Sequence, residues 1–336
     1  MDLFNSALGR NITFVRPSHF IIRGFIGISN VKYYYVFLFT VFIISVLGNV
    51  FVMLLILLDH NLQTPKYIAV FSLAVSDLLN SCALVPKLLD IFLFNHNLIS
   101  YSDCLTFLFF CYVCLSMEAL NLVALAYDRL IAIVSPLHYH IRITHKVMSG
   151  LIAFFWTFVI LVVLIATGLL TRLSFCDSVV IKSYFCDHGQ LYKLGCNDTS
   201  PNRIIALLLI LVILCLYPIL IFWLPLAFIL FSYLYIAVTL AKVATVREGL
   251  KAFKTCIGHL LLVSIYFIPL LIVFTLMGKI HPNARIINLS MTSVFPSMLN
   301  PIIYVLQTQE IKDSVKRLLQ ITRKSRIAVR QKAVKM

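Results

Sequence analysis

The sequence predicts an all-α membrane protein, a seven-transmembrane helix bundle with a C-terminal amphipathic surface helix. Of its 336 residues, 61% are hydrophobic and 12% are charged, and the mean hydropathy is +0.98. Soluble domains have about 25% charged residues. Seven apolar stretches are near or above the roughly 20 residues that a bilayer-spanning helix needs. They lie at about 33–58, 67–94, 104–134, 147–171, 204–241, 255–278 and 286–306.

The distribution of charge predicts how the chain crosses the membrane. A net charge of +15 is expected beside anionic cytoplasmic lipid, so we predict membrane lipid as a partner and no nucleic acid. Basic residues in the short loops divide seven against six, but the C-terminal segment adds nine more. The positive-inside rule places that segment in the cytoplasm. Seven spans then place the N-terminus outside the cell.

Two segments are interrupted by residues that are unusual in an apolar helix, and these interruptions indicate how each segment is used. Residues 1–32 are predicted to be an extracellular segment, in which arginines leave no cleavable signal peptide, so the first helix acts as an uncleaved signal. The stretch 204–241 is long enough for two short spans. Pro218 and Pro225 interrupt it, but no polar turn does. Because proline is tolerated inside membrane helices, we expect one long, kinked helix.

The longest outer loop, residues 172–203, carries three cysteines at ten-residue steps, Cys176, Cys186 and Cys196. This spacing indicates a disulfide framework in an oxidising compartment. Asn11 and Asn197 begin sequons on the predicted outer face, so both are candidate glycosylation sites. Chance occurrence of so short a motif is the alternative.

The end of the chain is amphipathic and then basic. In residues 307–320 one face collects four apolar residues, Ile311, Val315, Leu318 and Leu319. This pattern predicts a helix on the inner membrane surface, with a solvated helix as the alternative. Residues 321–336 form a basic cytoplasmic tail.

Three charged residues interrupt the third apolar stretch: Glu118, Asp128 and Arg129. Eleven positions separate Glu118 from Arg129, which places both on one face of a helix. Polar residues at such depth face the bundle interior. Candidate partners of Glu118 are Asn49, Asp77 and Asn300. Two mid-membrane carboxylates without a nearby lysine indicate a shared sodium ion or proton, and purely structural hydrogen bonding is the alternative.

The chain resembles the rhodopsin-like G-protein-coupled receptors in having an Asp-Arg pair ending its third span and Asn-Pro-x-x-Tyr at 300–304. Within that superfamily it is most similar to the odorant (olfactory) receptors, from about residue 30 to 320. The supporting motifs are NLQTPKYIAVFSLAVSDLL (61–79), LAYDRLIAIVSPLHYHIRIT (125–144), SYLYI (232–236), KAFKTCIGHLLLVS (251–264) and PSMLNPIIYVLQTQEIKDSVKRLL (296–319). Departures at 63–67 and 130–134 indicate a divergent, fish-type branch.

The resemblance implies a receptor that binds a small odorant within the bundle and activates a heterotrimeric G protein of the stimulatory, olfactory type, raising cAMP. It implies no enzyme activity and no cofactor beyond a possible sodium ion at Asn49, Asp77 and Glu118. It places the protein in the plasma membrane, in the cilia of olfactory sensory neurons. The implied disulfides are Cys104–Cys186 and Cys176–Cys196.

The resemblance also implies a switch near the cytoplasm, made by Asp128, Arg129, Tyr233, His259, Asn300, Pro301 and Tyr304. At rest Asp128 would hold Arg129. On activation Arg129 would meet the G protein, with Tyr233 and Tyr304 swinging toward it. His259 would latch the third and sixth helices, and a merely packed histidine is the alternative.

The implied ligand pocket lies between the third, fifth, sixth and seventh helices. Its candidate lining is Cys111, Tyr112, Leu115, Ser116, Tyr217, Ile221, Phe267, Leu271, Phe274 and Thr292. This mostly apolar set suits small, partly hydrophobic ligands, and ordinary helix packing is the alternative for each residue. Cys111 and Val294 stand where amine receptors carry an acid and opsins a lysine, which disfavours amines and retinal.

Three basic residues near the outer end, Lys87, Lys279 and Arg285, could attract an anionic odorant, but we interpret them as solvated rim charges. A receptor for a non-odorant lipid or hormone is the main alternative function. A transporter is less well supported because no inverted repeats are visible. A membrane enzyme is disfavoured because no HExxH or GxSxG motif is present.

Overall fold

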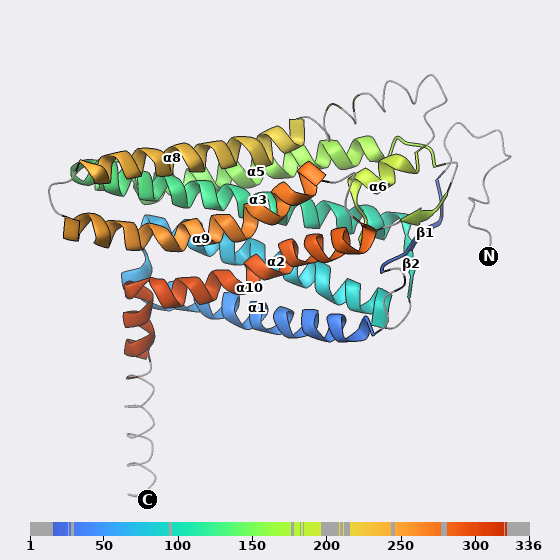
Figure 1. Ribbon diagram of the computed structural model, residues 1–336, viewed down its shortest axis with the longest axis horizontal. Coiled ribbons are helices and arrows are strands. Elements are labelled where there is room, and N and C mark those ends of the chain that lie inside the picture. The colour runs from blue at the N-terminus through green and yellow to red at the C-terminus, as the bar shows by residue number, and fades with distance from the viewer. Residues whose placement is uncertain are drawn as a thin grey trace, which may run out of the picture.

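Among the residues that the structure describes, seven long helical segments lie side by side in one bundle (Figure 1). In this computed structural model they are α1 (Lys32–Leu58), α2 (Pro65–Leu93), α3 (Tyr101–Val134), α5 (His145–Leu170), η4 (Ile219–Trp223) with α8 (Leu224–Ala241), α9 (Val246–Leu276) and α10 (Pro282–Gln307). The described residues are 16–25, 27, 30–93, 96–175, 178–181, 183, 185–195, 208, 211, 216–242, 246–276, 281–318 and 320.

The outer faces of the bundle are apolar. Six helices of the described chain are long and apolar enough to cross a membrane, and α9 contributes a shorter apolar part, Cys256–Ile272. Large side chains such as Leu47, Phe154 and Phe231 are 67%, 61% and 71% exposed. Such a surface is stable in lipid, where the helices satisfy their own backbone hydrogen bonds. The predicted fold class, a seven-helix membrane bundle, is confirmed.

The fifth and sixth helices differ in detail from the expectation. η4 is a π-helix, and it lies immediately before Pro225 in α8. Proline lacks an N–H and its ring clashes with the carbonyl four residues earlier, so a widened turn accommodates it without ending the helix. The described part therefore continues as one irregular helix. α9 begins at Val246, nine residues before the expected start, because its first turns lie beyond the apolar run.

A small sheet at the outer end was not predicted. β1 (His19–Ile22) pairs antiparallel with β2 (Leu98–Ser100) and parallel with β3 (Val180–Ile181), in the order β2-β1-β3. Figure 1 shows β1 and β2 across the end of the bundle opposite the C-terminal helix. The sheet ties the N-terminal segment to the long outer loop, which also contains α6 (His188–Lys193).

The outer loop is anchored to α3 by the Cys104–Cys186 disulfide, which joins residues 82 positions apart. Both cysteines are buried beside the sheet residues Phe20 and Ile99. Cys176 and Cys196 lie outside the described residues, as do Asn11 and Asn197. The expected second bridge and the glycosylation sites therefore stay predictions.

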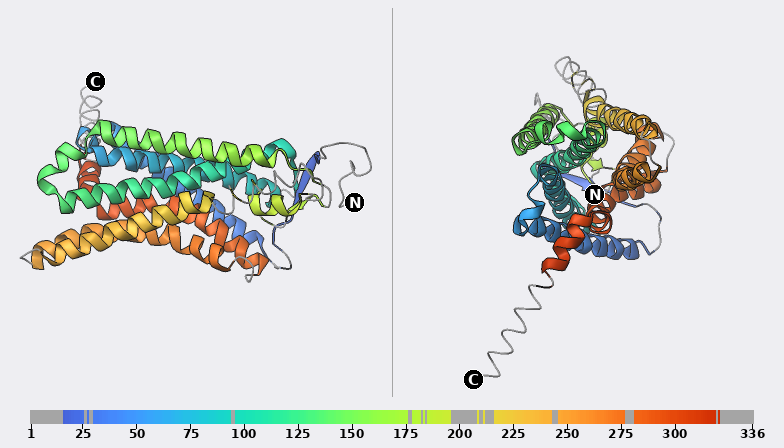
Figure 2. Two further views of the ribbon diagram at one scale, coloured as in Figure 1. Left: turned by 90° about the horizontal axis from the view of Figure 1, so that it is seen from above. Right: turned by 90° about the vertical axis from the view of Figure 1, so that its left-hand side faces the viewer.

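The inner end is closed by short turns. They are η1 (His60–Leu62), η2 (Pro136–His138) and α4 (Tyr139–Arg142). Residues 309–318 are helical and turn away from the bundle axis after α10, as Figures 1 and 2 show. Ile311 of this C-terminal helix is 1% exposed and packs into the core. Its contact with the membrane surface stays a prediction.

Of the six described spans that are long enough to cross a membrane, α3 is the most buried. Within its apolar span 72% is buried, against 28% for α5. It packs against α2, α5 and α8 and also contacts α9. The polar residues in its middle, Ser116, Glu118 and Asn121, are buried and therefore meet other helices and not lipid. A second close contact joins α1 to α10, where a Cβ added at Gly48 would lie 2.8 Å from the Pro301 ring.

Candidate functional site

An outer cavity of about 120 Å³ lies under the long loop, between α3, η4, α9 and α10. Four of the predicted ligand residues line it: Tyr112, Leu115, Tyr217 and Ile221. Ser116 lies behind the wall and bonds the Tyr217 hydroxyl at 2.7 Å. The structure therefore brings about half of the expected lining together at one site.

The other predicted residues do not line this cavity. Cys111 packs in a cluster toward α1 and α2. Phe267 packs against Phe222, with ring centroids 5.5 Å apart. Thr292 donates its hydroxyl hydrogen to the Asn288 carbonyl of its own helix. Leu271 packs against the main core, and the side chain of Phe274 lies outside the described residues.

The predicted lining residues of α9 lie one position away from those that reach the cavity. The residues of α9 that reach the cavity are Tyr266 and Leu270, each one position before the expected Phe267 and Leu271. One residue is a rotation of about 100° on a helix. Because apolar residues surround this helix on all sides, hydrophobicity does not indicate which face is inward.

Two lining residues come from the outer loop, Phe185 and Asp187. They flank Cys186, so the disulfide brings them to α3, and the expected Cys104–Cys186 pairing was the signal that could have identified them. The remaining unpredicted lining residues are Pro218, Phe222, Arg285 and Leu289.

Asp187 is the centre of a polar roof over the outer cavity. It accepts hydrogen bonds from Arg285 Nη2 at 2.6 Å and from the Tyr112 hydroxyl at 3.0 Å. The Arg285 and Asp187 side chains are only 13% and 8% exposed. Arg285 is therefore not the solvated rim charge that we expected. Lys87 pairs instead with Asp90 at 3.0 Å, and Lys279 lies outside the described residues.

A network of buried polar residues links α1, α2, α3 and α10 in the middle of the bundle. Asn300 donates to Asp77 at 2.7 Å, and Asn80 donates to Glu118 at 3.0 Å. Asn80 also donates to the Ser293 carbonyl at 3.0 Å. Asp77 and Glu118 thus lie in the expected neighbourhood, but each has an asparagine partner. Asn80 was not predicted.

Asn49 has a partner that follows from a proline. Its amide donates to the Ser297 carbonyl at 2.7 Å. Pro301 is four residues after Ser297 and has no N–H to give that carbonyl. Asn49 therefore satisfies a backbone acceptor that would otherwise be unpaired in the membrane interior, which joins α1 to α10 at the proline.

Both carboxyl groups retain an oxygen that accepts no hydrogen bond from the described residues. These are Asp77 Oδ1 and Glu118 Oε2. The side-chain amide oxygens of Asn80 and Asn121 also accept no hydrogen bond from the described residues. All four are buried oxygen atoms. Oxygen ligands are what hard cations such as sodium bind, and a proton on either carboxyl group would also satisfy one of them.

An inner cavity of about 250 Å³ opens at the end of the bundle that carries the C-terminal helix. Arg129, His259 and Tyr304 line it together. The expected ion pair between Asp128 and Arg129 is not formed among the described residues. Asp128 instead accepts a hydrogen bond from the Tyr139 hydroxyl of α4 at 2.7 Å. Neighbouring residues on a helix point about 100° apart, which separates the two side chains.

His259 joins three helices. Its Nε2 lies 3.1 Å from the Leu122 carbonyl of α3 and its Nδ1 lies 2.7 Å from the Tyr233 hydroxyl of α8. A carbonyl only accepts, so Nε2 carries the hydrogen and Nδ1 accepts from Tyr233. The histidine therefore joins α9 to α3 and to Tyr233 in this structure, and its role as a latch stays a prediction.

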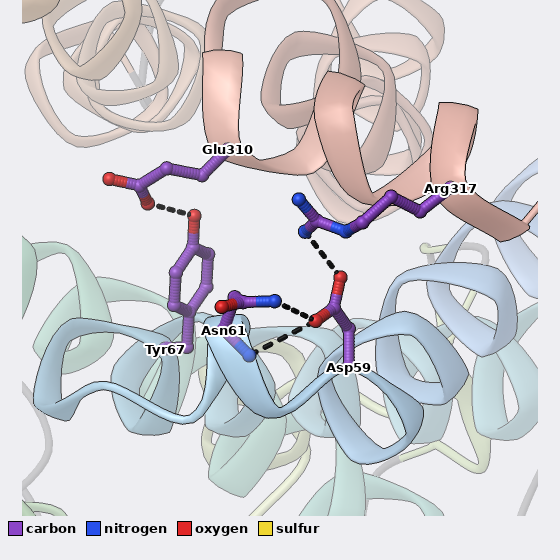
Figure 3. Close-up of polar contacts among 5 residues, drawn as sticks. All are labelled: Asp59, Asn61, Tyr67, Glu310 and Arg317. Carbon is purple, nitrogen blue, oxygen red and sulfur yellow. Dashed lines mark hydrogen bonds and ion pairs between the residues drawn. The ribbon is translucent and has the colours of Figure 1, made fainter.

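Two groups of contacts hold the C-terminal helix, one to the turn between α1 and α2 and one to the first turn of α2 (Figure 3). Arg317 pairs with Asp59 at 2.6 Å. Glu310 accepts from Lys66 and Tyr67, each at 2.5 Å. The nearby Ser314 hydroxyl and the hydrogen bond from Arg317 lower the pKa of Asp59. Burial alone would raise the pKa of Glu310, but the bonds from Lys66 and Tyr67 lower it.

The fold and these contacts define a seven-helix membrane bundle with a cavity at each end and a polar core between them. A solved structure with the same fold is the crystal structure of squid rhodopsin, with a TM-score of 0.67 and 20% sequence identity. The match covers 87% of this chain and 82% of that one.

Sequence comparison identifies the family. The family model described as olfactory receptor matches residues 38–322. Olfactory receptor 1 of Rattus norvegicus is 33% identical over 85% of this chain and 88% of its own length. Olfactory receptor 1E16 of Mus musculus is 33% identical over 92% of this chain and 96% of its own length. The chain belongs to the olfactory receptor family, and it is a multi-pass signalling receptor, not an enzyme.

Proposed function

We propose that a small odorant binds in the outer cavity and shifts the bundle toward a packing that activates a heterotrimeric G protein of the stimulatory, olfactory type, raising cAMP. Binding at one end influences the other end only if the bundle has two packings and the ligand favours one of them. The proposal therefore requires contacts that connect the two cavities.

The observation that carries the proposal is a pair of aligned hydrogen bonds between α9 and α3. Tyr266, in the wall of the outer cavity, donates to the Leu115 carbonyl at 2.6 Å. His259, in the wall of the inner cavity, donates to the Leu122 carbonyl at 3.1 Å. Both donors and both acceptors are seven residues apart, which is close to two helical turns. A ligand that displaces Tyr266 would thus loosen the side of α9 that holds His259.

In this mechanism Arg129 meets the G protein when α9 moves outward, and Tyr304, in the same cavity, turns toward it. Prolines inside α9 and α10 supply the points at which the helices bend. Asn300 of α10 couples this movement to the middle of the bundle, because it donates a hydrogen bond to Asp77 of α2.

We also propose that Asp77 and Glu118 share a sodium ion or a proton at rest. Their unpaired oxygens support this, together with Asn49 as the residue that holds α10 beside them. Glu118→Gln should change basal activity or its dependence on sodium. Identical sodium titrations of basal cAMP for the two proteins would return Glu118 to a structural role.

We place the receptor in the plasma membrane of olfactory cilia with its N-terminus outside, and Asn11 and Asn197 are proposed to carry glycans. The Cys104–Cys186 disulfide supports an oxidising outer side. Cys104→Ser should block surface delivery, measured by antibody labelling of an N-terminal tag on intact cells. Normal labelling and signalling of this variant would contradict a structural need for the bridge.

The test of the function is a cAMP reporter screen of the expressed receptor against volatile and water-soluble odorants. We expect at least one small odorant to raise cAMP, and Arg129→Ala to abolish that response at equal surface expression. A response that survives in Arg129→Ala would contradict the assigned switch. Responses confined to lipids or hormones would favour a non-odorant ligand.

A further inference from the structure

The wall of the outer cavity contains one charged pair whose hydrogen bonds are incomplete. Arg285 lies in the first turn of α10 and pairs with Asp187 through Nη2 at 2.6 Å. Its Nε is buried and has no hydrogen-bond partner among the residues that the structure describes. A buried donor without a partner costs about 1–3 kcal/mol, so this N–H would gain from an acceptor on a ligand.

The other donors of the wall are already used. Tyr112 donates to Asp187, and Tyr266 donates to the Leu115 carbonyl. Ser116 donates to the Tyr112 carbonyl at 2.6 Å, so the bond between Ser116 and Tyr217 must use the Tyr217 hydrogen. All three tyrosine hydroxyl hydrogens of the lining are therefore committed to protein oxygens. His188 Nδ1 is also buried without a partner, but His188 does not line the cavity. Among the described residues of the lining, Arg285 Nε–H is therefore the buried side-chain donor left for a ligand.

The charge of the wall is balanced. The lining contains one cation, Arg285, and one anion, Asp187. His188 packs against Tyr112 with ring centroids 4.5 Å apart, and burial lowers its pKa to about 3, so it adds no charge at neutral pH. A carboxylate ligand would bring an unpaired negative charge into a mostly apolar cavity, which is costly. A neutral acceptor adds no charge.

We infer that the outer cavity selects a small, neutral carbonyl compound, such as a ketone or an ester, whose oxygen accepts a hydrogen bond from Arg285 Nε while its hydrocarbon part lies against Leu115, Ile221 and Phe222. This inference rests on the proposed odorant site and specifies its ligand class. Arg285 would be a specificity-determining residue, and Asp187 would exclude acids by neutralising it.

The test uses three six-carbon probes of similar size: butyl methyl ketone, hexane and hexanoate. Binding to the full-length receptor in lipid nanodiscs is measured by competition and by thermal stabilisation at neutral pH. One hydrogen bond to a charged donor predicts that the ketone binds about tenfold more tightly than hexane. Hexanoate should bind no more tightly than hexane. Equal binding of ketone and hexane, tighter binding of hexanoate, or no binding of the ketone would each overturn the inference.

Two variants separate the donor from the charge balance. Arg285→Lys keeps a cation for Asp187 but removes Nε, so the advantage of the ketone over hexane should fall to about twofold or less. Asp187→Asn keeps an acceptor for Tyr112 but leaves Arg285 without its counter-charge, so the preference should move to hexanoate. The control is Arg172→Lys, an exposed residue of the turn after α5, which should leave all three affinities unchanged.

The proposed function is tested by a separate measurement, the rate of nucleotide exchange on a stimulatory G protein added to the same nanodiscs. Ketone binding without exchange would contradict the proposed function and leave the ligand class standing. Exchange driven by hexane or hexanoate, without selectivity for the ketone, would support the receptor function and overturn the ligand class.

Discussion

The hydrogen bond from Tyr266 to the Leu115 carbonyl is the most direct test of how the outer cavity controls the bundle. Tyr266→Phe removes only the hydroxyl group, which donates to α3 at 2.6 Å, and keeps the ring that is 3% exposed in the core. If this bond holds α9 in its resting packing, the variant should be more active without any ligand.

The magnitude follows from the bond that is lost. A net hydrogen bond contributes about 0.5–1.5 kcal/mol, and the Leu115 carbonyl can keep its own helical partner, so little further cost arises from an unpaired acceptor. A loss of about 1 kcal/mol changes a two-state equilibrium about fivefold. Basal cAMP, measured per receptor at the cell surface, should therefore rise by about that factor while the active population is small.

The matched control is Tyr235→Phe on α8, because that side chain is 55% exposed and the same hydroxyl is removed without touching α3. It should leave basal cAMP unchanged. Equal basal activity of Tyr266→Phe and Tyr235→Phe at equal surface expression would show that this bond does not hold the resting packing. Lower basal activity of Tyr266→Phe would place the bond in the active packing instead.

Further predictions concern three other contacts. Gly48→Ala should destabilise the receptor by about 1–3 kcal/mol, seen as a lower thermal unfolding midpoint, because the new methyl group would lie 2.8 Å from a proline ring of α10; Gly150→Ala, with open space, is the control. Burial lowers the pKa of His188 to about 3. Acidification below about pH 6.5 should therefore lower the free energy of unfolding by about 1.4 kcal/mol per pH unit, because only the unfolded imidazole gains a proton. An unfolding midpoint that is constant between pH 7 and pH 5 would contradict this. Asp59→Asn removes the partner of Arg317 at 2.6 Å and should speed hydrogen exchange in the C-terminal helix without changing ligand affinity; unchanged exchange would contradict the clamp.

The helices could be predicted because hydrocarbon imposes a simple requirement on each segment. A span must be apolar for about 20 residues and must satisfy its own backbone. For the same reason, Asp77, Glu118 and Asn49 could be assigned to the interior, where the structure places them at 0%, 1% and 1% exposure. Their nearest partners were harder to predict. Asn80 is one of several polar residues of α2, and only the packing of α2 against α3 and α10 brings it to Glu118.

The side-chain partners of the switch residues could not be predicted from the sequence either. The sequence places Asp128 beside Arg129 but does not show that Tyr139, eleven residues later, reaches the carboxylate from α4. The roof of the outer cavity is a stronger case, because Asp187 and Arg285 are 98 residues apart. In the sequence, each resembles an ordinary exposed charge of a loop. They become partners because the Cys104–Cys186 disulfide holds the loop over α10.

Composition and motifs are enough to assign the class of this protein: a membrane bundle of seven helices with the motifs of an olfactory receptor, with acids in its core and an Asp-Arg pair at its inner end. The packing of the helices was needed to show which face of α9 meets the cavity and which donor remains for a ligand. Burial in lipid is a property of each segment's composition, whereas hydrogen-bond partners depend on how the helices are rotated and which neighbours they contact.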